Sequence, residues 1–461
     1  MEPFTTTALD VNNPATESAI TSIRLGGAAD VDRAVAAAKR AFAGFSIISK
    51  AERKAMLELI ATILERRNNE IVEIISQDLG APLAMAKSSQ APQGVAHFRQ
   101  TIKAMEDFDF EYMQGTTRVM QEPIGVVAMI TPWNWPFNQI AAKVAPALAT
   151  GCTIILKPSE LAPLNAILFA EVLDEAGVPP GVFNLVHGDG PTVGAALARH
   201  ADVDMISFTG STRAGISGAQ MAAETVKRVH QELGGKSPNI ILRSANLEEA
   251  VKAGVSRCFN NSGQSCNAPT RMLVPVEMLD AAMTFAAEAA ADTIAGPPQD
   301  ADTVIGPVIS KAQFDKIDGM IRTAIDEGAQ LVAGGAGRPE GLTTGYYVRP
   351  TVFAHVTNDM AIARDEVFGP VLAMIAYDSL EEAVEIANDT AYGLAAYIQG
   401  DPTEARLLSR KLRTGSVRIN SPAWDGAAPF GGYKQSGNGR EYGKFGLQEF
   451  TEVKAVIGYD S

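Results

Sequence analysis

The chain has 461 residues, of which 46% are hydrophobic and 20% are charged, so we expect a globular protein with two or three domains. Its formal net charge of −14 argues against a nucleic-acid partner and against an anionic membrane surface. The most apolar stretch, residues 125–156, is interrupted by prolines and polar residues, so no membrane span is expected.

Cysteine and histidine usage excludes several further classes. Cys152, Cys258 and Cys266 are too few and too far apart for a disulfide framework or a zinc site. Cys152 begins a predicted apolar strand and Cys258 lies on a predicted helix, so we expect both to be inert core residues. Residues 1–7 have neither a basic start nor an apolar run, so we expect a cytoplasmic protein. None of the five histidines has ligand spacing or adjoins a catalytic-looking serine, which argues against a metal site and a Ser-His-Asp triad.

The N-terminal part of the chain predicts helices followed by a hairpin. From Asp30 to Asp78, apolar residues recur at three- and four-residue spacing, which is typical of amphipathic helices. Residues 107–122 alternate around Gln114 and Gly115 and therefore predict two antiparallel strands.

From Gly125 onward, short apolar strands alternate with helices in two series. We expect parallel βαβ units, because strands separated by helices of ten or more residues need crossover connections. The predicted strands are 126–130, 153–156, 182–186 and 205–208 in the first series, and 239–242, 271–274, 371–375 and 416–419 in the second. The predicted helices of the first series are 139–150 and 165–176. The boundary falls near Gly234 and Gly235, which predicts two α/β domains with a site between them.

The C-terminal residues 450–457 alternate like one isolated strand. Such a strand must find a sheet edge to pair with, and another subunit is a plausible source of that edge. The hairpin at 107–122 is similarly without a predicted partner.

Cys266 and Glu232 are the residues most typical of catalysis. Cys266 lies between Ser265 and Asn267, whereas structural cysteines prefer apolar neighbours and a reactive thiolate prefers polar ones. Glu232 lies thirty-four residues earlier (266 − 232), beside two glycines, on a segment without helical or strand periodicity. We interpret the two as a nucleophile and a base that work through a thioester-type intermediate.

Two polar clusters follow predicted strands of the first series. In residues 130–137, Asn134 is held between two tryptophans, where its amide can donate to a developing oxyanion, or can simply satisfy the backbone of a packed loop. Lys157 and Glu160 end the next strand, where they can hold the ribose of a nucleotide or can form an ordinary helix start.

Two weaker clusters lie later in the chain. Residues 208–215 predict a strand, a turn and a helix start that present backbone N–H groups and the Ser211 hydroxyl to a phosphate, although the GxGxxG fingerprint is missing. In residues 364–370, Glu366 can hold a ribose and Phe368 can press on a nicotinamide, although a charged loop before a strand is the better explanation when this cluster is taken alone.

Together these motifs resemble the NAD(P)-dependent aldehyde dehydrogenase superfamily over essentially the whole chain. The matching segments, in the right order and with the right separations, are Asn13-Pro-Ala-Thr16, Thr131-Pro-Trp-Asn134, Lys157-Pro-Ser-Glu160, Phe208-Thr-Gly-Ser-Thr212, Glu232-Leu-Gly-Gly-Lys236, Gly263-Gln-Ser-Cys266, Glu366-Val-Phe-Gly-Pro370, Tyr392-Gly-Leu394 and Pro429-Phe-Gly-Gly-Tyr-Lys-Gln-Ser-Gly437. The resemblance implies that Cys266 attacks an aldehyde as a thiolate. Asn134 and the Cys266 backbone N–H would hold the oxyanion, and Glu232 would activate water to hydrolyse the thioester. The implied NAD contacts are Lys157 and Glu160 on the adenosine ribose, Ser211 on the pyrophosphate, Glu366 on the nicotinamide ribose and Phe368 on the ring, with Gly210, Trp133 and Gly234 also in the cofactor site.

The resemblance also implies an α/β, aldehyde dehydrogenase-like fold with three parts. These are a Rossmann-like NAD-binding domain (1–104 and 124–235), an α/β catalytic domain (236–435) and a small β oligomerisation element (105–123 and 449–461). A homodimer or homotetramer is therefore expected.

The chain departs from the family's pattern in two places. A leading strand that is common in the family is not recognisable before Asn12, and Gln231 replaces an apolar residue where it can affect the orientation of Glu232. Glu160 favours NAD over NADP, because a carboxylate on the ribose hydroxyls repels a 2′-phosphate. Lys157 can offset this repulsion, so NADP stays possible but less favoured.

The expected substrate tunnel is aromatic and consists of Trp135, Phe137, Trp424 and Phe430. Ala142 is small where the family often has a bulky aromatic residue, which predicts an apolar, aromatic or heteroaromatic aldehyde such as a pyridine semialdehyde. No arginine beyond Arg271 is expected near Cys266, so short dicarboxylic semialdehydes are disfavoured.

Three alternatives remain. The chain can be a CoA-acylating, phosphorylating or semialdehyde-specific relative, a cysteine hydrolase that uses Cys266, Glu232 and a lysine, or a binding or structural protein that has lost activity. Glu232 argues for water as acyl acceptor, since relatives that use another acceptor typically lack it. The cofactor motifs argue against the hydrolase, and the intact Cys266, Glu232 and Asn134 argue against the inactive protein.

Overall fold

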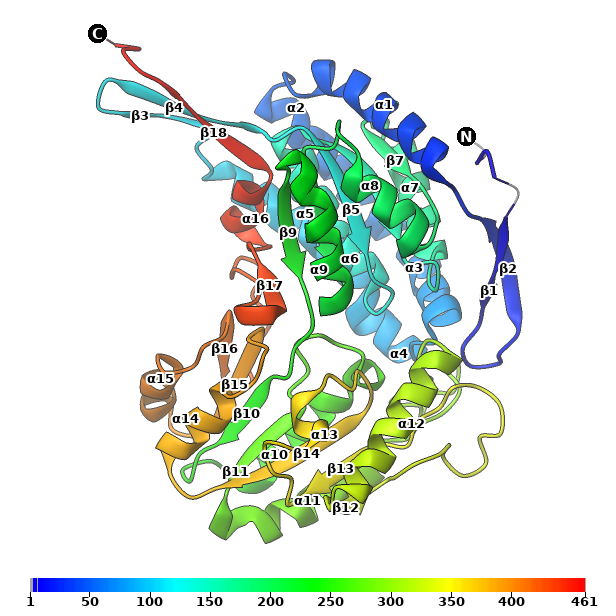
Figure 1. The fold of residues 1–461 in the computed structure, drawn as a ribbon, viewed down its shortest axis with the longest axis vertical. Helices are drawn as coiled ribbons and strands as arrows, with labels where there is room; N and C mark the ends of the chain where they lie inside the picture. The colour runs from blue at the N-terminus through cyan, green and yellow to red at the C-terminus, as the bar shows by residue number, and fades with distance from the viewer. Residues whose placement is uncertain (1–2, 6, 461) are drawn as a thin grey trace.

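The computed structural model describes residues 3–5 and 7–460 and contains two large β-sheets with helices on both faces (Figure 1). The six-stranded sheet lies in the upper part of Figure 1 and the seven-stranded sheet in the lower part. Consecutive strands in both sheets are mostly parallel, which confirms the predicted βαβ units. Among the described residues, no helix is long and apolar enough to cross a membrane.

The six-stranded sheet has the order β17-β9-β8-β5-β6-β7. Its strands are β5 (Val126–Thr131), β6 (Thr153–Pro158), β7 (Phe183–Leu185), β8 (Met205–Thr209), β9 (Arg228–Glu232) and β17 (Gly437–Asn438). Four of them confirm predicted strands, whereas β9 was not predicted, because Arg228, His230 and Glu232 give it no apolar face.

Helices pack on both faces of this sheet. One face is covered by α2 (Lys50–Arg66), α5 (Ala91–Glu106), α6 (Pro136–Thr150) and α7 (Leu164–Glu175), and the other by α1 (Ala28–Phe45), α8 (Ala195–Arg199) and α9 (Thr212–Ala222). Two shorter helices, α3 (Asn68–Ile74) and α4 (Leu83–Met85), lead into α5. Helix α6 is buried along nearly its whole length and contains one charged residue, Lys143.

The seven-stranded sheet has the order β12-β13-β14-β11-β10-β15-β16. Its strands are β10 (Pro238–Ile241), β11 (Arg271–Pro275), β12 (Gln330–Ala333), β13 (Thr351–Ala354), β14 (Val371–Tyr377), β15 (Ala395–Gln399) and β16 (Ser416–Ile419). One face packs on α10 (Leu247–Phe259) and α11 (Leu279–Ala291), and the other on α12 (Lys311–Asp326), α13 (Ala361–Arg364), α14 (Leu380–Asn388) and α15 (Pro402–Ser409). Gly234 and Gly235, the predicted boundary, lie between β9 of the six-stranded sheet and β10 of the seven-stranded sheet. The residue limits of the domains stay a prediction.

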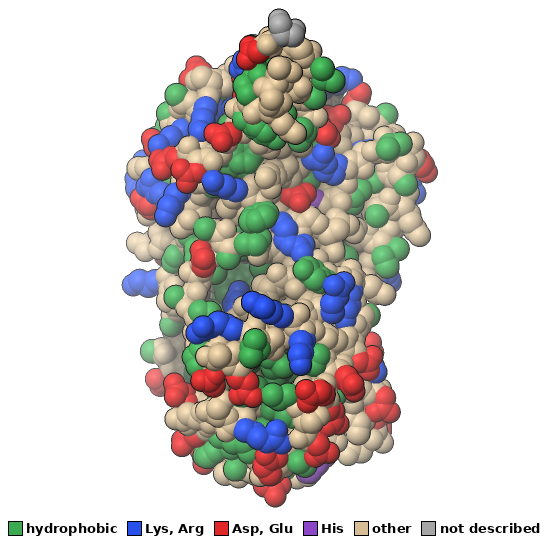
Figure 2. Space-filling model, turned by 90° about the vertical axis from the view of Figure 1, so that its left-hand side faces the viewer, with side chains coloured by type: hydrophobic (Ala, Val, Ile, Leu, Met, Phe, Trp, Pro, Cys, Tyr) green, Lys and Arg blue, Asp and Glu red, His purple; other side chains and the backbone are tan. Residues whose placement is uncertain are grey.

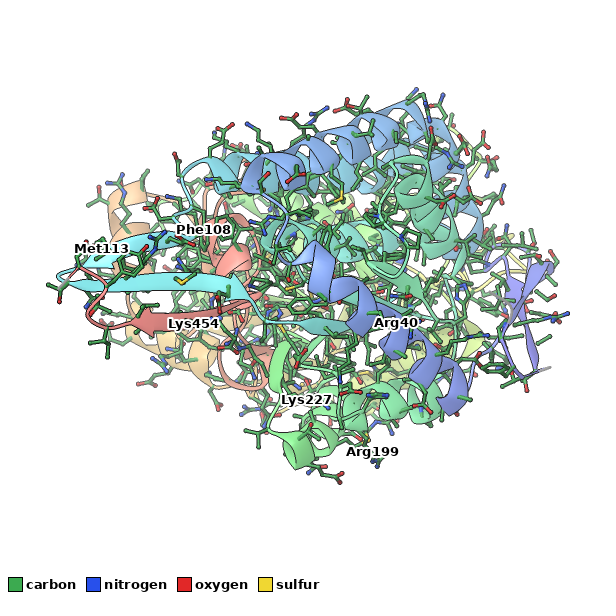
Figure 3. All side chains as sticks on the ribbon, turned by 90° about the horizontal axis from the view of Figure 1, so that it is seen from above. Arg40, Phe108, Met113, Arg199, Lys227 and Lys454 are labelled. Carbon is green, nitrogen blue, oxygen red and sulfur yellow. The ribbon has the colours of Figure 1, made fainter. Side chains whose placement is uncertain are left out.

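A three-stranded antiparallel sheet joins the predicted hairpin to the C-terminal strand. β3 (Glu111–Gln114) and β4 (Thr117–Pro123) form the hairpin, and β18 (Thr451–Val456), which follows α16 (Gly443–Glu449), pairs with β4. In Figure 3, Met113 near the hairpin tip and Lys454 on β18 mark how this sheet projects from the body. The two isolated elements therefore pair with each other, and the C-terminal strand does not depend on another subunit for its first partner.

The N-terminal residues correct a second expectation. β1 (Ala8–Asn12) pairs antiparallel with β2 (Ala19–Arg24), so the expectation of a missing strand before Asn12 is wrong. Val11 and Ile23 are the buried residues of this hairpin, and its other side chains are mostly exposed, which explains why no periodic apolar signal is visible.

Candidate functional site

The nucleophile loop begins with a turn that only a few residue types tolerate. Helix α10 ends at Phe259, and Asn261, Ser262 and Gly263 follow with positive φ values of 55°, 56° and 72°. A Cβ atom on Gly263 would lie 1.9 Å from the carbonyl oxygen of Gly369, so glycine is required there on two grounds. The turn reverses the chain and places Cys266 between the two sheets.

Three hydrogen bonds fasten the loop after β5 to the nucleophile loop. Asn134 Nδ2 donates to the Gln264 carbonyl at 2.9 Å, and the Asn134 carbonyl accepts from Asn261 Nδ2 at 2.8 Å. Trp135 Nε1 donates to Ser265 Oγ at 2.8 Å. Asn134 is 3% exposed, so its amide is fixed, and an NH₂ group that makes one such bond retains a second hydrogen to donate.

Glu232 is the last residue of β9, which corrects the expectation that it lies outside any strand. Its side chain is 2% exposed, and neither carboxylate oxygen has a hydrogen-bond partner in the described structure. His230 Nε2 lies 3.7 Å from Glu232 Oε1. Glu232 does not line either of the cavities described below, and its carboxylate faces Gly431 and His230. Gln231 Nε2 donates to the Gly215 carbonyl at 2.6 Å. This residue, which departs from the family's pattern, therefore connects β9 to α9 and does not hydrogen-bond to Glu232.

A buried polar cluster lies behind Glu232 and was missed in the sequence. Lys143 Nζ lies 2.7 Å from Glu441 Oε1 and donates to Ser207 Oγ at 3.1 Å. Ser207 Oγ in turn lies 3.4 Å from His230 Nδ1. The one available signal was a lysine inside the otherwise apolar helix α6, because such a lysine needs a buried partner.

Burial and charge shift the pKa values in this cluster in different directions. Burial, and secondarily the charge of Glu441, raise the pKa of Glu232 well above its ordinary value. Burial opposes the ionisation of Glu441 as well, but the charge of Lys143 and its hydrogen bond contribute to lowering the pKa of Glu441 below its ordinary value. Burial and the Lys143 charge lower the pKa of His230 to about 3, so this imidazole is neutral.

The thiol of Cys266 is in less favourable surroundings than the sequence indicates. Burial raises its pKa, and the carboxylates of Glu232, Glu366 and Glu441 raise it further, whereas the Asn267 backbone N–H lowers it. In the resting protein these surroundings favour the thiol form of Cys266 over the thiolate. Cys152 and Cys258 are buried, as expected for core residues.

Two cavities meet at Cys266. The larger has a volume of about 560 Å³ and is lined in part by Trp135, Trp424, Phe430 and Tyr442. Phe137 does not line it, because this side chain points to the opposite side of α6, where it is fully buried against Phe169. Ala142 is buried as well and lines neither cavity.

The larger cavity also contains two arginines that we did not expect. Arg257 on α10 and Arg418 on β16 both line it, together with Tyr397. The expectation that no arginine beyond Arg271 lies near Cys266 is therefore wrong. Arg271 itself is buried and donates to backbone carbonyls, including that of Lys236 at 3.0 Å.

The smaller cavity has a volume of about 220 Å³ and lies at the N-terminal end of α9. It brings together six of the predicted cofactor residues, namely Trp133, Gly210, Ser211, Gly234, Glu366 and Phe368. Six further lining residues were not predicted, namely Pro132, Gln139, Thr209, Leu233, Gln313 and Lys316. Ser211 caps α9 by accepting from the Ala214 N–H at 3.3 Å, so it has a structural role as well.

The glycines between the sheets let backbone and carboxylate approach each other closely. Glu366 Oε1 accepts from the Gly235 N–H at 2.9 Å, and a Cβ on Gly234 would lie 2.6 Å from Glu366 Oε2. A Cβ on Gly235 would lie 2.3 Å from the Cys266 carbonyl. Trp133 and Phe368 meet edge to face with ring centroids 5.4 Å apart.

Lys157 and Glu160 lie at the end of β6, outside the lining of both cavities. Lys157 Nζ lies 3.0 Å from Glu160 Oε2, so the two charges form an ion pair. Glu160 remains partly exposed and Lys157 is buried, which leaves the carboxylate as the more accessible member.

Comparison with known proteins agrees with this arrangement. Residues 2–456 match the model of the Aldehyde dehydrogenase family. A 3-succinoylsemialdehyde-pyridine dehydrogenase of a Pseudomonas species is 54% identical over 453 residues, which cover 98% of this chain and 95% of that protein. An aldehyde dehydrogenase C variant from Pseudomonas syringae, solved with NAD+ and octanal, is 52% identical with a TM-score of 0.99, over 100% of this chain and 95% of that one. A Mycobacterium tuberculosis aldehyde dehydrogenase solved with NAD+ is 39% identical with a TM-score of 0.97, over 99% of this chain and 96% of that one.

The site and the comparisons agree. The site has a cysteine that lines two cavities, a fixed amide beside it and a buried glutamate, and the match to the family model covers almost the entire chain. The chain belongs to the aldehyde dehydrogenase family.

Proposed function

We propose that this protein oxidises an aldehyde to the carboxylic acid with NAD+, through a thioester on Cys266. The observation that carries the proposal is the position of Cys266, which lines both the larger cavity and the smaller one. An aldehyde in the larger cavity and a dinucleotide in the smaller one would meet at this sulfur. NAD+ is present in the solved relatives from Pseudomonas syringae and Mycobacterium tuberculosis, which supports the choice of cofactor.

The residues of the smaller cavity fit a dinucleotide. Backbone N–H groups at the start of α9, next to Gly210 and Ser211, suit a pyrophosphate, because the N-terminus of a helix attracts anions. Glu366 suits ribose hydroxyls, and Phe368 with Trp133 offers ring faces to a nicotinamide. Lys157 and Glu160 would hold the adenosine ribose at the end of β6. When bound, NAD+ supplies the acceptor for the hydride that the aldehyde carbon loses.

The chain's own residues carry the covalent chemistry. Cys266 Sγ attacks the carbonyl carbon and releases its proton to solvent water, while the carbonyl electron pair moves to the oxygen. Asn134 Nδ2 and the Cys266 backbone N–H donate to that oxygen, and the hydrogen bond from Asn134 to Gln264 keeps the amide in place. Loss of the hydride then leaves the acyl group on Cys266 as a thioester.

Glu232 is the proposed base for hydrolysis of this thioester. A water molecule would lose a proton to the Glu232 carboxylate and attack the acyl carbon, which releases the acid and returns the proton to sulfur. In the resting structure the Glu232 carboxylate faces His230, so its side chain must turn toward Cys266 for this step.

An aromatic or heteroaromatic aldehyde is the proposed substrate. Trp135, Trp424 and Phe430 line the larger cavity and suit a flat ring. The relative of 54% identity is named for a pyridine semialdehyde, which supports the same class.

We also propose that the three-stranded sheet contributes to a homodimer or homotetramer. β3 and β18 are its outer strands, and both carry exposed apolar side chains, namely Tyr112, Met113 and Val453. Light scattering of the full chain, compared with a Val453→Lys variant, would show whether this edge holds subunits together.

The decisive experiment compares wild type with Glu232→Ala in rapid mixing of enzyme, NAD+ and an aldehyde. The variant should form at most one NADH per active site and then stop, because the thioester accumulates. Cys266→Ala, as the matched control, should form none. Steady turnover by Glu232→Ala at the wild-type rate would refute the role of this residue and would favour another acyl acceptor.

A further inference from the structure

We infer that the substrate carries a carboxylate at the end remote from its aldehyde group, and that Arg257 and Arg418 bind this carboxylate. The inference rests on the proposed function, because it concerns the cavity in which Cys266 would meet the aldehyde. It narrows the substrate class beyond an aromatic aldehyde.

Arg257 and Arg418 come from different elements and meet at one side chain. Arg257 lies on α10, nine residues before Cys266 (266 − 257), and Arg418 lies on β16. Their Cζ atoms lie 5.4 Å and 5.6 Å from the centroid of the Tyr397 ring. Such contacts with an aromatic face help to fix a guanidinium group. Both cations therefore lie beside Tyr397 in the lining of the larger cavity.

Tyr397 connects this place to the nucleophile loop. The side chain is 2% exposed, and its hydroxyl donates to the backbone carbonyl of Asn267 at 2.9 Å. Since Asn267 follows Cys266 directly, the spacing between the arginines and the sulfur is set by a buried contact. A ligand that reaches both must have a defined length.

The larger cavity is positive although the protein is acidic. The net charge of the chain is −14, yet the described residues that line this cavity include both arginines and no aspartate or glutamate. Within residues 3–5 and 7–460, neither arginine forms an ion pair, and both are only half-buried. Figure 2, which shows the left-hand side of Figure 1, has Lys and Arg side chains across its middle. Positive charge in a cavity with apolar walls concentrates the potential and draws an anion inward.

A carboxylate satisfies this arrangement better than a neutral group does. Two guanidinium groups near one ring repel each other, and a carboxylate accepts charge-assisted hydrogen bonds from both while it compensates their charge. A pyridine nitrogen accepts one hydrogen bond and compensates nothing. The stacked rings of Phe430 and Tyr442, with centroids 5.3 Å apart, would contact the part of the substrate between its two ends.

The test uses aldehydes that differ mainly in charge. The kcat/KM for NADH formation is measured with 4-carboxybenzaldehyde, 4-methylbenzaldehyde and pyridine-3-carbaldehyde, and with succinic semialdehyde against butanal. We expect the kcat/KM of each aldehyde that carries a carboxylate to exceed that of its neutral counterpart by about tenfold or more. A hydrogen bond to a charged group stabilises a complex enough to account for a factor of this size. The preference should fall as the ionic strength rises.

Variants assign the preference to the two arginines. Arg257→Gln and Arg418→Gln should each reduce the ratio of carboxylate to neutral kcat/KM by about tenfold, mainly through KM, and Arg→Lys should retain part of it. Arg413→Gln is the matched control, because this substitution removes the same charge from an exposed arginine that lies outside the larger cavity. It should leave the ratio within about twofold of wild type.

The outcomes separate this inference from the function beneath it. NADH formation with equal or better use of the neutral aldehydes, or a ratio that the Arg257 and Arg418 variants do not change, would overturn the inference and leave the dehydrogenase assignment intact. Failure to form NADH from any of these aldehydes would overturn the proposed function itself.

Discussion

The buried ion pair between Lys143 and Glu441 gives a sharp test of the cluster behind Glu232. Lys143 Nζ lies 2.7 Å from Glu441 Oε1, and both side chains are almost completely excluded from solvent. Lys143→Met removes the cation with little change in volume and leaves the Glu441 carboxylate buried without its counter-ion. Breaking a buried pair in this way costs about 3–5 kcal/mol, because the remaining charge has lost its solvation and its partner.

An exposed pair provides the comparison. Lys54 Nζ lies 2.8 Å from Glu106 Oε1, close to the distance in the buried pair, but both side chains are well exposed. Lys54→Met should therefore cost only about 0–1 kcal/mol. The difference between the two variants isolates the effect of burial on the same residue change.

The destabilisation caused by Lys143→Met should depend on pH, and the pKa of Glu441 fixes the direction of this dependence. In the wild type the pKa of Glu441 is lowered, so its contribution to stability is present above the unfolded pKa and is lost as the pH falls through the folded pKa. Without Lys143, burial would raise the pKa of Glu441 above its unfolded value. The destabilisation of Lys143→Met should thus be largest at neutral pH and above, and should shrink as acid protonates Glu441.

The assay is urea unfolding followed by tryptophan fluorescence, at about pH 7.5 and about pH 5.5 at fixed protein concentration. Lys143→Met with Glu441→Gln should recover part of the loss, because the double variant buries no isolated charge. A shift of the Lys143→Met midpoint no larger than that of Lys54→Met, or a shift that is the same at both pH values, would refute this reasoning.

Three further predictions concern the site. The pKa of Glu232 is raised well above 4.5, and only its carboxylate form can accept a proton from water. Single-turnover hydrolysis of the thioester should therefore slow as the pH falls, and the slowing should begin well above pH 4.5. A Glu232→Gln variant with the same pH profile as wild type would contradict this role of Glu232. Glu160→Gln should raise kcat/KM with NADP relative to NAD, because it removes the charge that repels a 2′-phosphate, and an unchanged ratio would disprove the reading of Glu160. Gly263→Ala should prevent folding or abolish labelling of the Cys266 thiol by iodoacetamide, since the added Cβ would lie 1.9 Å from the Gly369 carbonyl oxygen. Gly319→Ala is the control: its Cβ would lie in open space on α12, so the substitution should increase the free energy of unfolding by up to about 1 kcal/mol.

Patterns along the chain predicted a large part of the fold. Strand–helix alternation located β5, β6, β8, β10, β11, β14 and β16, because buried parallel strands are continuous apolar runs. Some of the elements it missed produce no apolar period, because β9 is buried but polar and β1 and β2 are largely exposed. The buried strands β13 and β15 were also missed, although they are as buried as the strands that were located. Pairing of β18 with β4 joins residues more than three hundred positions apart, which no local pattern records.

Local patterns along the chain were enough to identify the residue types that carry the chemistry. Cys266, Asn134 and Glu232 were found from their polar neighbours and from motifs, since loop residues that face a site are not constrained by the helical or strand period. The structure decided their surroundings. Burial in the folded protein raises the pKa of Cys266, and three carboxylates from distant segments raise it further. The fold also places the Glu232 carboxylate 3.7 Å from His230 Nε2.

Only the tertiary structure decided what lines the substrate cavity. Phe137 belongs to the same short segment as Trp135, yet one turns into the core and the other toward Cys266, because helix α6 begins between them and sets opposite directions for the two side chains. Arg257 and Arg418 lie 161 positions apart (418 − 257) and carry no shared motif. They become neighbours only when α10 and β16 pack around Tyr397, since the direction of a side chain depends on the element that holds it and on what that element packs against.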